Sequence, residues 1–423
     1  MVTTTCQERR GLERLDRPAL AELQLARLNA LLAEILPHNQ FYAAKFGQVK
    51  LPLKSLSDLA SLPLTTKAEL AADGAHDMAA NRTWPVEQYV RFHRTSGTRG
   101  RPLAVLDTAA DWQWWIDGWQ FVLDAAEVGA DDRALMAFSF GPFIGFWSAH
   151  DALAARGAMV IPAGGMNSVA RLELARTSEA TVMLCTPTYA LHLAEVAHDN
   201  QIDVGRLGVR RIIVAGEPGG SVPAIRRRLE TTWNAQVVDH SGATEIGPWG
   251  YSDPERRGLL VNESAFVAEF LAVESDQPAA EGELSELVLT TLGRAGAPVI
   301  RYRTGDLVRP TWKADGDCRF VLLDGGVLGR ADDMMIIRGV NVFPSGVEQI
   351  LRSFPEVVEY RLTACKRGQM DALQVEVEDR LEEPGRIAKE LQLKLGLHVD
   401  VALAPLGSLP RFEGKGKRFV DQR

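Results

Sequence analysis

Two short segments combine the residue types that chemistry on a phosphate or a carboxylate needs. Segment 94–102 (RTSGTRGRP) has small residues, hydroxyls and arginines, so its backbone amides and side chains could cradle a phosphate. It lacks the spacing of a nucleotide P-loop, and such a run often forms only a turn. Segment 409–418 (LPRFEGKGKR) carries Lys415 in a basic run that, taken alone, indicates only a solvated tail.

Four further segments place glycine beside hydroxyl or carboxylate residues. Segment 214–220 (VAGEPGG) is a strand entering a glycine-rich turn, which a flat ligand could approach closely. Segment 239–247 (DHSGATEIG) sets a hydroxyl beside a carboxylate, a pair suited to Mg²⁺ on a nucleotide. In 301–306 (RYRTGD) the aspartate is an acceptor-only group suited to two ribose hydroxyls. Segment 329–344 (GRADDMMIIRGVNVFP) follows a glycine-rich turn.

The elements that must position these segments predict two parts. Helical patterns alternate with β-rich runs, which indicates an α/β part with largely parallel sheets; the runs are 134–140, 158–162, 181–185, 211–214 and 236–239. The last ninety residues read as helix, two strands, helix and strand, an α+β unit. We therefore expect a large domain over 1–328 and a small one over 329–423.

Two local patterns are expected to be structural. Three tryptophans share one face of a predicted helix over 107–127, where core packing is the preferred interpretation. Ser345 and Glu348 have the spacing of a capping box at a helix start.

Composition excludes several classes of protein. The 423 residues are 46% hydrophobic and 24% charged with a net charge of −8, which is ordinary for a globular protein. This balance gives no electrostatic reason to expect nucleic acid or a membrane as partner. Four scattered cysteines and the absence of a secretory or membrane-spanning run favour a soluble protein of the reducing cytoplasm.

Taken together and in this order, the six segments resemble those of the adenylate-forming superfamily of acyl-CoA synthetases, most closely its phenylacetate-CoA ligase branch. The resemblance covers residues 18–423. It implies a large adenylate-forming domain followed by a mobile C-terminal lid domain with a catalytic lysine. It also implies an ATP-dependent ligase that joins a carboxylic acid to AMP, releases pyrophosphate and passes the acyl group to coenzyme A, with Mg²⁺ bound to ATP.

The resemblance assigns roles residue by residue. The expected catalytic residues are Lys415, Thr244 and Glu245, the last also the Mg²⁺ ligand. The ATP and AMP site is expected to comprise Thr95, Ser96, Gly97, Thr98, Gly100, Gly216, Glu217, Ser241, Gly242, Asp306 and Arg330. The hinge is expected at Asp332, and the coenzyme A channel at Gly339 and Val340. The expected acid pocket comprises Phe143, Phe146, Trp147, Ala215 and Ala243.

The chain departs from the family pattern at one site position. Ser241 stands where a tyrosine usually stacks on adenine, so either the adenine wall differs or the nucleotide binds more weakly. Segment 251–263 contains no Cys or His, so no structural zinc is expected. The aromatic residues of 138–150 favour an aryl or arylacetic acid, although such residues are as often core as ligand wall.

Two other functions stay open at this stage. One is an adenylate-forming enzyme that delivers the activated group to an amine, a carrier protein or another acceptor in place of coenzyme A. The other is an inactive binding or scaffold homologue. A small-molecule acid is the expected partner, and both a homodimer and a carrier protein are compatible with the sequence.

Overall fold

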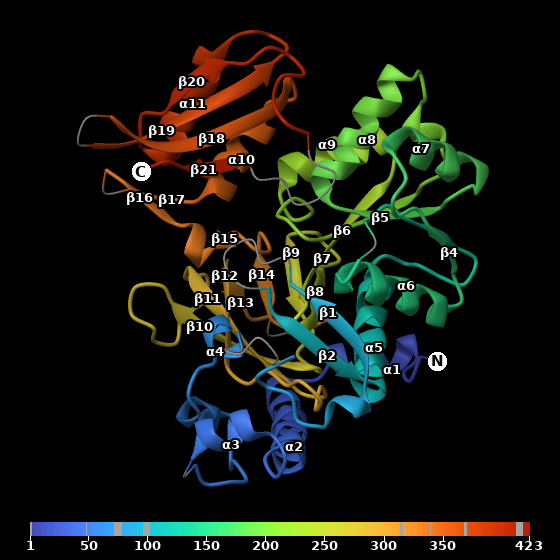
Figure 1. Cartoon of the computed structure of the whole chain (residues 1–423), viewed down its shortest axis with the longest axis vertical. Coiled ribbons are helices and arrows are strands. Elements are labelled where there is room, and N and C mark those ends of the chain that lie inside the picture. Colours follow the sequence, from blue (N-terminus) through green and yellow to red (C-terminus); the bar gives the residue numbers. More distant parts are fainter. Residues whose placement is uncertain are drawn as a thin grey trace.

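The computed structural model describes residues 2–47, 49–71, 78–95, 102–139, 141–313, 316–338, 340–367, 370–411 and 418–423 (Figure 1). Its α-helices are α1 Cys6–Glu13, α2 Arg17–Ile35, α3 Gln40–Phe46, α4 Lys67–Leu70, α5 Ala109–Ala125, α6 Ile144–Arg156, α7 Ser168–Thr177, α8 Pro187–Asp199, α9 Pro223–Trp233, α10 Pro344–Arg352 and α11 Pro384–Leu395. Among these residues, no helix is both long and apolar enough to cross a membrane.

A mixed sheet forms the centre of the molecule. From edge to edge, the described strands are β13 Pro310–Thr311, β14 Leu322–Asp324, β9 Gly258–Val261, β8 Gly247–Ser252, β7 Gln236–Ala243, β6 Arg211–Val214, β5 Val182–Cys185, β3 Arg133–Met136 and β4 Met159–Pro162. Pairing is parallel from β4 to β7 and antiparallel from β7 to β13. The expected parallel sheet is therefore confirmed for one half, and the β7–β8 hairpin begins the other half.

Two smaller sheets lie beside it in the large part. One is antiparallel and contains β10 Phe266–Ala272, β11 Ser285–Thr291, β12 Tyr302–Val308 and β15 Gly329–Arg330. The other is a hairpin of β1 Tyr89–Arg94 and β2 Ala104–Thr108. At its end Thr95 exchanges hydrogen bonds with Leu103, its amide donating to the carbonyl over 3.0 Å and its Oγ1 accepting from the amide over 2.9 Å.

The C-terminal part packs helices α10 and α11 on a separate sheet (Figure 1). That sheet has the order β20 Asp400–Leu403, β19 Met370–Asp379, β18 Val357–Arg367 and β21 Phe419–Asp421. A short hairpin of β16 Met335–Ile337 and β17 Val340–Val342 precedes it. The predicted α+β unit is thus confirmed, and β21 adds a strand that the basic tail did not predict.

The tryptophan face of α5 is buried, as expected. Trp112, Trp115 and Trp119 are each at most 6% exposed, and they pack in a core cluster that extends to α6 and the central sheet. Burying three indoles contributes several kcal/mol to folding and fixes α5 against the sheet.

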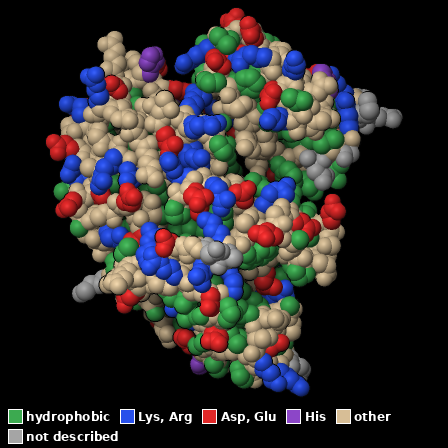
Figure 2. All heavy atoms as spheres, turned by 180° about the vertical axis from the view of Figure 1, so that it is seen from behind, with side chains coloured by type: hydrophobic (Ala, Val, Ile, Leu, Met, Phe, Trp, Pro, Cys, Tyr) green, Lys and Arg blue, Asp and Glu red, His purple; other side chains and the backbone are tan. Residues whose placement is uncertain are grey.

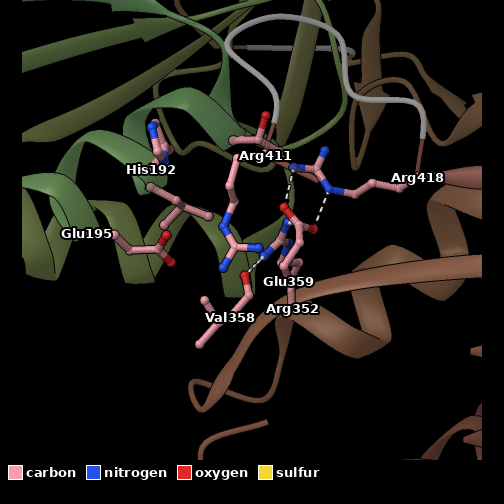
Figure 3. A pocket seen from close by; sticks show the side chains of 9 residues that line it. His192, Glu195, Arg352, Val358, Glu359, Arg411 and Arg418 are labelled. Atoms are coloured by element: carbon pink, nitrogen blue, oxygen red, sulfur yellow. Dashed lines mark hydrogen bonds and ion pairs between the residues drawn. The ribbon is translucent and has the colours of Figure 1, made fainter. Parts of the chain in front are cut away.

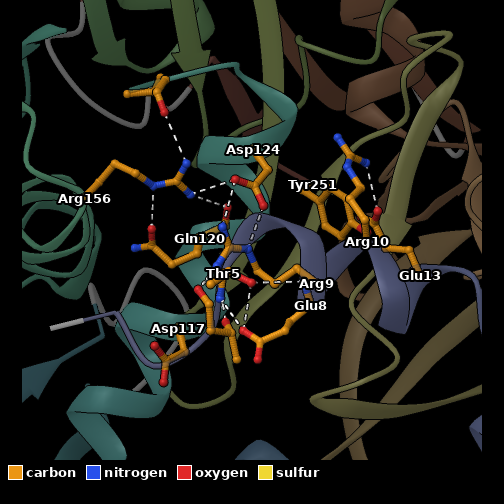
Figure 4. Close-up of polar contacts among 12 residues, drawn as sticks. Thr5, Glu8, Arg9, Arg10, Glu13, Asp117, Gln120, Asp124, Arg156 and Tyr251 are labelled. Carbon is orange, nitrogen blue, oxygen red and sulfur yellow. Dashed lines mark hydrogen bonds and ion pairs between the residues drawn. The ribbon is translucent and has the colours of Figure 1, made fainter. Parts of the chain in front are cut away.

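The N-terminal helix α1 is held to this core by buried polar contacts (Figure 4). Arg9, 2% exposed, makes two hydrogen bonds to the carboxylate of Asp124 on α5, over 2.6 and 2.9 Å. The hydroxyl of Tyr251 on β8 donates to Glu13 over 2.6 Å. These contacts link α1 to the sheet that carries the β7–β8 turn.

The expected capping box at Ser345 and Glu348 is wrong. Helix α10 begins at Pro344, which has no N–H to cap, so Ser345 lies inside the first turn. Its hydroxyl donates to the carbonyl of Leu328 over 2.6 Å, and it ties α10 to the end of the large part.

Candidate active site

The turn between β7 and β8 presents Thr244 and Glu245 at the end of the parallel half of the sheet. The guanidinium of Arg294 donates to both of their carbonyls, over 3.3 Å and 2.8 Å. Arg294 is in turn ion-paired with Asp107 of β2, Nε to Oδ1 at 2.8 Å, and both side chains are fully buried. A buried pair of this kind is costly to break, so it fixes the shape of the turn.

The Glu245 carboxylate is oriented by a tyrosine. The Tyr302 hydroxyl donates to Oε1 of Glu245 over 2.9 Å. Burial and this carboxylate raise the pKa of Tyr302, so the hydroxyl stays protonated and remains a donor.

A carboxylate–arginine pair lies next to Tyr302. Nη1 of Arg330 donates to Oδ1 of Asp306 over 2.6 Å, at paired positions of β15 and β12. Gly305 has φ of 73°, and a Cβ there would lie 3.0 Å from Nη2 of Arg330, so glycine lets the guanidinium approach. Although burial opposes it, the carboxylates of Asp306, Asp332 and Glu245 raise the pKa of Arg330. The expected ribose and metal residues therefore converge on one region.

The Glu245 side chain is suited to bind a metal ion. Oε1 accepts from Tyr302, and no hydrogen bond to Oε2 is found among the described residues. The carboxylate also lines a small cavity with Leu70, Asn81, Leu103, Ala104, Val105 and Ala297. Glu245 is half-buried at the cavity wall, and a carboxylate oxygen is a ligand type that Mg²⁺ prefers.

The residues expected to contact the adenine, Gly216 and Glu217, lie directly after β6. Gly216 is exposed with φ of 93°, a conformation that favours glycine. The Glu217 carboxylate accepts hydrogen bonds from the amide of Thr188, over 2.8 Å, and from its hydroxyl. Burial, and then the Glu348 carboxylate of α10, raise the pKa of Glu217. Its side chain is thus engaged at the start of α8, while Ser241 and Gly242 lie at the end of β7.

The expected acid-pocket residues have different environments. Phe143, which precedes α6, is 45% exposed, whereas Phe146 is 2% exposed within the core. Trp147 is half-buried and its Nε1 donates to the carbonyl of Gly141 over 2.8 Å. Ala215 and Ala243 are half-buried at the ends of β6 and β7. Whether these five positions line one pocket stays a prediction.

Several expected residues lie outside the described residues: Ser96, Gly97, Thr98, Gly100, Gly339 and Lys415. Asp332 lies in a short 3₁₀ turn directly after β15, and Val340 begins β17. The segment of Lys415 is flanked by two ion-paired arginines: Arg411 bonds Glu378 over 2.7 Å, and Arg418 bonds Glu359 over 2.6 Å.

A polar pocket between α8 and the C-terminal part was not predicted from the sequence (Figure 3). Helix α8 contributes His192 and Glu195, and the C-terminal part contributes arginine and glutamate side chains: Arg352, Glu359, Arg411 and Arg418. Burial raises the pKa of Glu195, and the Arg411 guanidinium opposes that change. The residues come from three distant stretches of sequence, 188–195, 352–359 and 411–418, so no local pattern could have joined them. On the face of the molecule drawn in Figure 2, basic and acidic side chains are interspersed.

Comparison with known proteins finds similar sequences along nearly the whole chain. The AMP-binding enzyme family matches residues 35–267, and the AMP-binding enzyme C-terminal domain matches residues 339–423. Phenylacetate-coenzyme A ligase of Escherichia coli (strain K12) is 32% identical, over 96% of this chain and 95% of the relative. The enzyme of the same name from Thermus thermophilus is 31% identical, over 97% of this chain and 98% of the relative.

Solved structures match the fold over the same span. 2-Hydroxyisobutyryl-CoA ligase in the postadenylation state, in complex with 2-HIB-AMP, superposes with a TM-score of 0.91 at 25% identity, over 97% of this chain and 91% of that chain. The same ligase in complex with 2-HIB-AMP and CoA in the thioesterification state gives 0.74 at 26% identity, over 99% and 93%. Because these are two states of one protein, the two parts of this chain are arranged more like those of the postadenylation state.

Proposed function

This chain belongs to the AMP-binding enzyme family, and from that premise we propose that it is an ATP-dependent carboxylic acid–CoA ligase. Similarity over nearly the full length to phenylacetate-coenzyme A ligases supports an AMP-forming reaction with coenzyme A as acceptor. The observation that carries the proposal is the convergence of the Thr244–Glu245 turn with the Asp306–Arg330 pair, joined through Tyr302.

In the first half-reaction a carboxylate oxygen of the acid attacks the α-phosphorus of ATP, and the bond to the bridging oxygen breaks to release pyrophosphate. Thr244 would contact the α-phosphate, and Asp306 would accept from the ribose hydroxyls. Glu245 would hold Mg²⁺, which neutralises phosphate charge when bound. Thr95 and segment 96–100 would hold the β- and γ-phosphates, with Gly216, Glu217, Ser241 and Gly242 around the adenine.

In the second half-reaction the thiol sulfur of coenzyme A attacks the acyl carbon, and AMP leaves. We propose that residues 1–328 form the body and residues 329–423 the lid, which turns about Asp332 between the two steps. Lys415 on the lid would serve adenylation, and Gly339 with Val340 would border the thiol after the turn. The similarity to the postadenylation state of 2-hydroxyisobutyryl-CoA ligase supports the adenylation arrangement for this structure.

We propose an aromatic acid as substrate. Two exposed or half-buried aromatic side chains at the start of α6, Phe143 and Trp147, could contact an aryl group, and the similarity to phenylacetate-coenzyme A ligases favours the same class. Phe146 would support these two side chains from the core.

Acid-dependent exchange of ³²P between pyrophosphate and ATP tests the activation step. We expect exchange with at least one aryl or arylacetic acid, dependent on Mg²⁺ and independent of coenzyme A. Exchange with aliphatic acids alone would contradict the aromatic assignment, and no exchange with any acid would favour the inactive scaffold.

A further inference from the structure

His240 of β7 is a buried imidazole to which the proposed reaction gives no role. It is 6% exposed, and it lies in β7 three residues before Ala243, the last residue ahead of the Thr244–Glu245 turn. Its ring centroid lies 4.2 Å from that of Trp119 on α5, and Trp119 Nε1 donates to Ser148 of α6 over 3.0 Å. The imidazole is therefore enclosed by the hairpin on one side and by the α5–α6 layer on the other.

The hydrogen bond of Nδ1 fixes the tautomer of this ring. Nδ1 lies 2.8 Å from the carbonyl oxygen of Gly250, which can only accept, so Nδ1 carries the proton. Burial lowers the pKa of His240 to about 4, and the ring is neutral at physiological pH. Nε2 consequently presents a lone pair and acts as an acceptor.

Nε2 has no hydrogen-bond partner among the residues that the structure describes. It reaches toward Gly242: a Cβ at this residue would lie 3.5 Å from Nε2 and only 2.9 Å from the carbonyl oxygen of Gly247. Gly242 itself is exposed, and the absence of a side chain lets the backbone of Gly247 approach it beside the imidazole. Nε2 can therefore accept a hydrogen bond from a ligand that supplies a donor.

Nε2 of His240 lies near the position that the acid is expected to occupy. On the proposed function, the acid is joined to the α-phosphate at Thr244, two residues beyond Gly242, so its acyl group lies beside the same turn. We propose that Nε2 of His240 accepts a hydrogen bond from a hydroxyl or amino group of the acid. The preferred substrates are then acids that carry such a donor, and the unsubstituted parent acids are poorer.

Pairs of acids that differ by one donor test this assignment on the wild-type enzyme. Benzoic acid and phenylacetic acid are compared with their ring-hydroxylated and amino-substituted isomers by kcat/KM for pyrophosphate exchange. We expect at least one substituted isomer to exceed its parent by about tenfold or more, because a site built to bond a hydroxyl discriminates against its absence. Equal or higher kcat/KM for the parents throughout would overturn the assignment and leave the ligase activity intact. No exchange with any acid would overturn both.

Two substitutions test the roles of the two ring nitrogens of His240 separately. In His240→Asn the amide can still donate to Gly250 but no acceptor reaches the Nε2 position, whereas in His240→Gln the side-chain oxygen reaches that position. We expect His240→Asn to lower the ratio of kcat/KM for substituted over parent acid about tenfold, and His240→Gln to retain most of it. Identical ratios in His240→Asn and the wild type would overturn the proposal, since a purely structural histidine affects both acids alike.

Discussion

At the scale of single residues, the site depends on side chains that are oriented by one or two hydrogen bonds each. Tyr302 is the sharpest case, because its hydroxyl donates to the Glu245 oxygen Oε1 while leaving Oε2 free of described partners. In the sequence the tyrosine lies within RYRTGD, where only the aspartate has a predicted role. The role of the tyrosine follows from the pairing of β12 with β11, in a fold that brings the Tyr302 hydroxyl within hydrogen-bond distance of Glu245.

Substitution of Tyr302 by Phe tests this orientation. We expect the pyrophosphate-exchange rate to fall about tenfold and the Mg²⁺ concentration for half-maximal rate to rise severalfold, because the carboxylate loses one buried hydrogen bond. Tyr42→Phe is the matched control: it also removes a buried hydroxyl, one that accepts from the amide of Ile300 over 2.9 Å. An unchanged Mg²⁺ requirement in Tyr302→Phe would contradict the assignment.

At the scale of elements, strand β7 carries two buried titratable groups in succession. Burial raises the pKa of Asp239 from 3.8 to about 6, although Ser221 Oγ donates to its carboxyl over 2.5 Å. The folded state therefore binds more protons than the unfolded state between these values. The contribution of Asp239 to stability is fully present below about pH 4 and is lost as the pH rises to about 6.

Asp239→Asn removes this titration and keeps the shape, since the amide can donate to the serine hydroxyl. The thermal midpoint of the variant relative to wild type should increase as the pH rises from 4 to 6 and then stay constant. The difference corresponds to at most about 3 kcal/mol. A difference that does not change with pH, measured by thermal unfolding from pH 4 to 8, would show that Asp239 is ionised in the folded protein.

Much of the fold could be predicted from periodicity, and the misses have local causes. Helix α5, predicted over 107–127 and observed over Ala109–Ala125, could be predicted because its tryptophans recur at helical spacing. Strand β7 extends four residues beyond its predicted end, because pairing with β8 continues through Ser241 and Ala243, which have no β-forming bias. The role of Arg294 could not be predicted, because a lone arginine between Gly293 and Ala295 has no local signature and its partners Asp107 and Glu245 are distant in sequence.

At the scale of the whole molecule, the two parts meet through contacts that a rotation of the lid would break. Nη1 of Arg228 on α9 donates to the carbonyl of Val357 over 3.3 Å, and α8 faces the arginines of the C-terminal part across the polar pocket (Figure 3). A single hydrogen bond of this kind contributes only about 1 kcal/mol, so the two parts can change their arrangement at low cost in free energy. This property fits a lid that serves two half-reactions in turn.

The central claim is that the acid activated with ATP is delivered to coenzyme A. Mass detection of products from an aromatic acid, ATP and Mg²⁺, with and without coenzyme A, tests it most directly. Lys415→Ala serves as the control, expected to lose adenylation but to form thioester from supplied acyl-adenylate. We predict one acyl-CoA and one AMP for each pyrophosphate released when coenzyme A is present. Release of AMP and pyrophosphate with no acyl-CoA, or an amide formed with an added amine in its place, would contradict the claim.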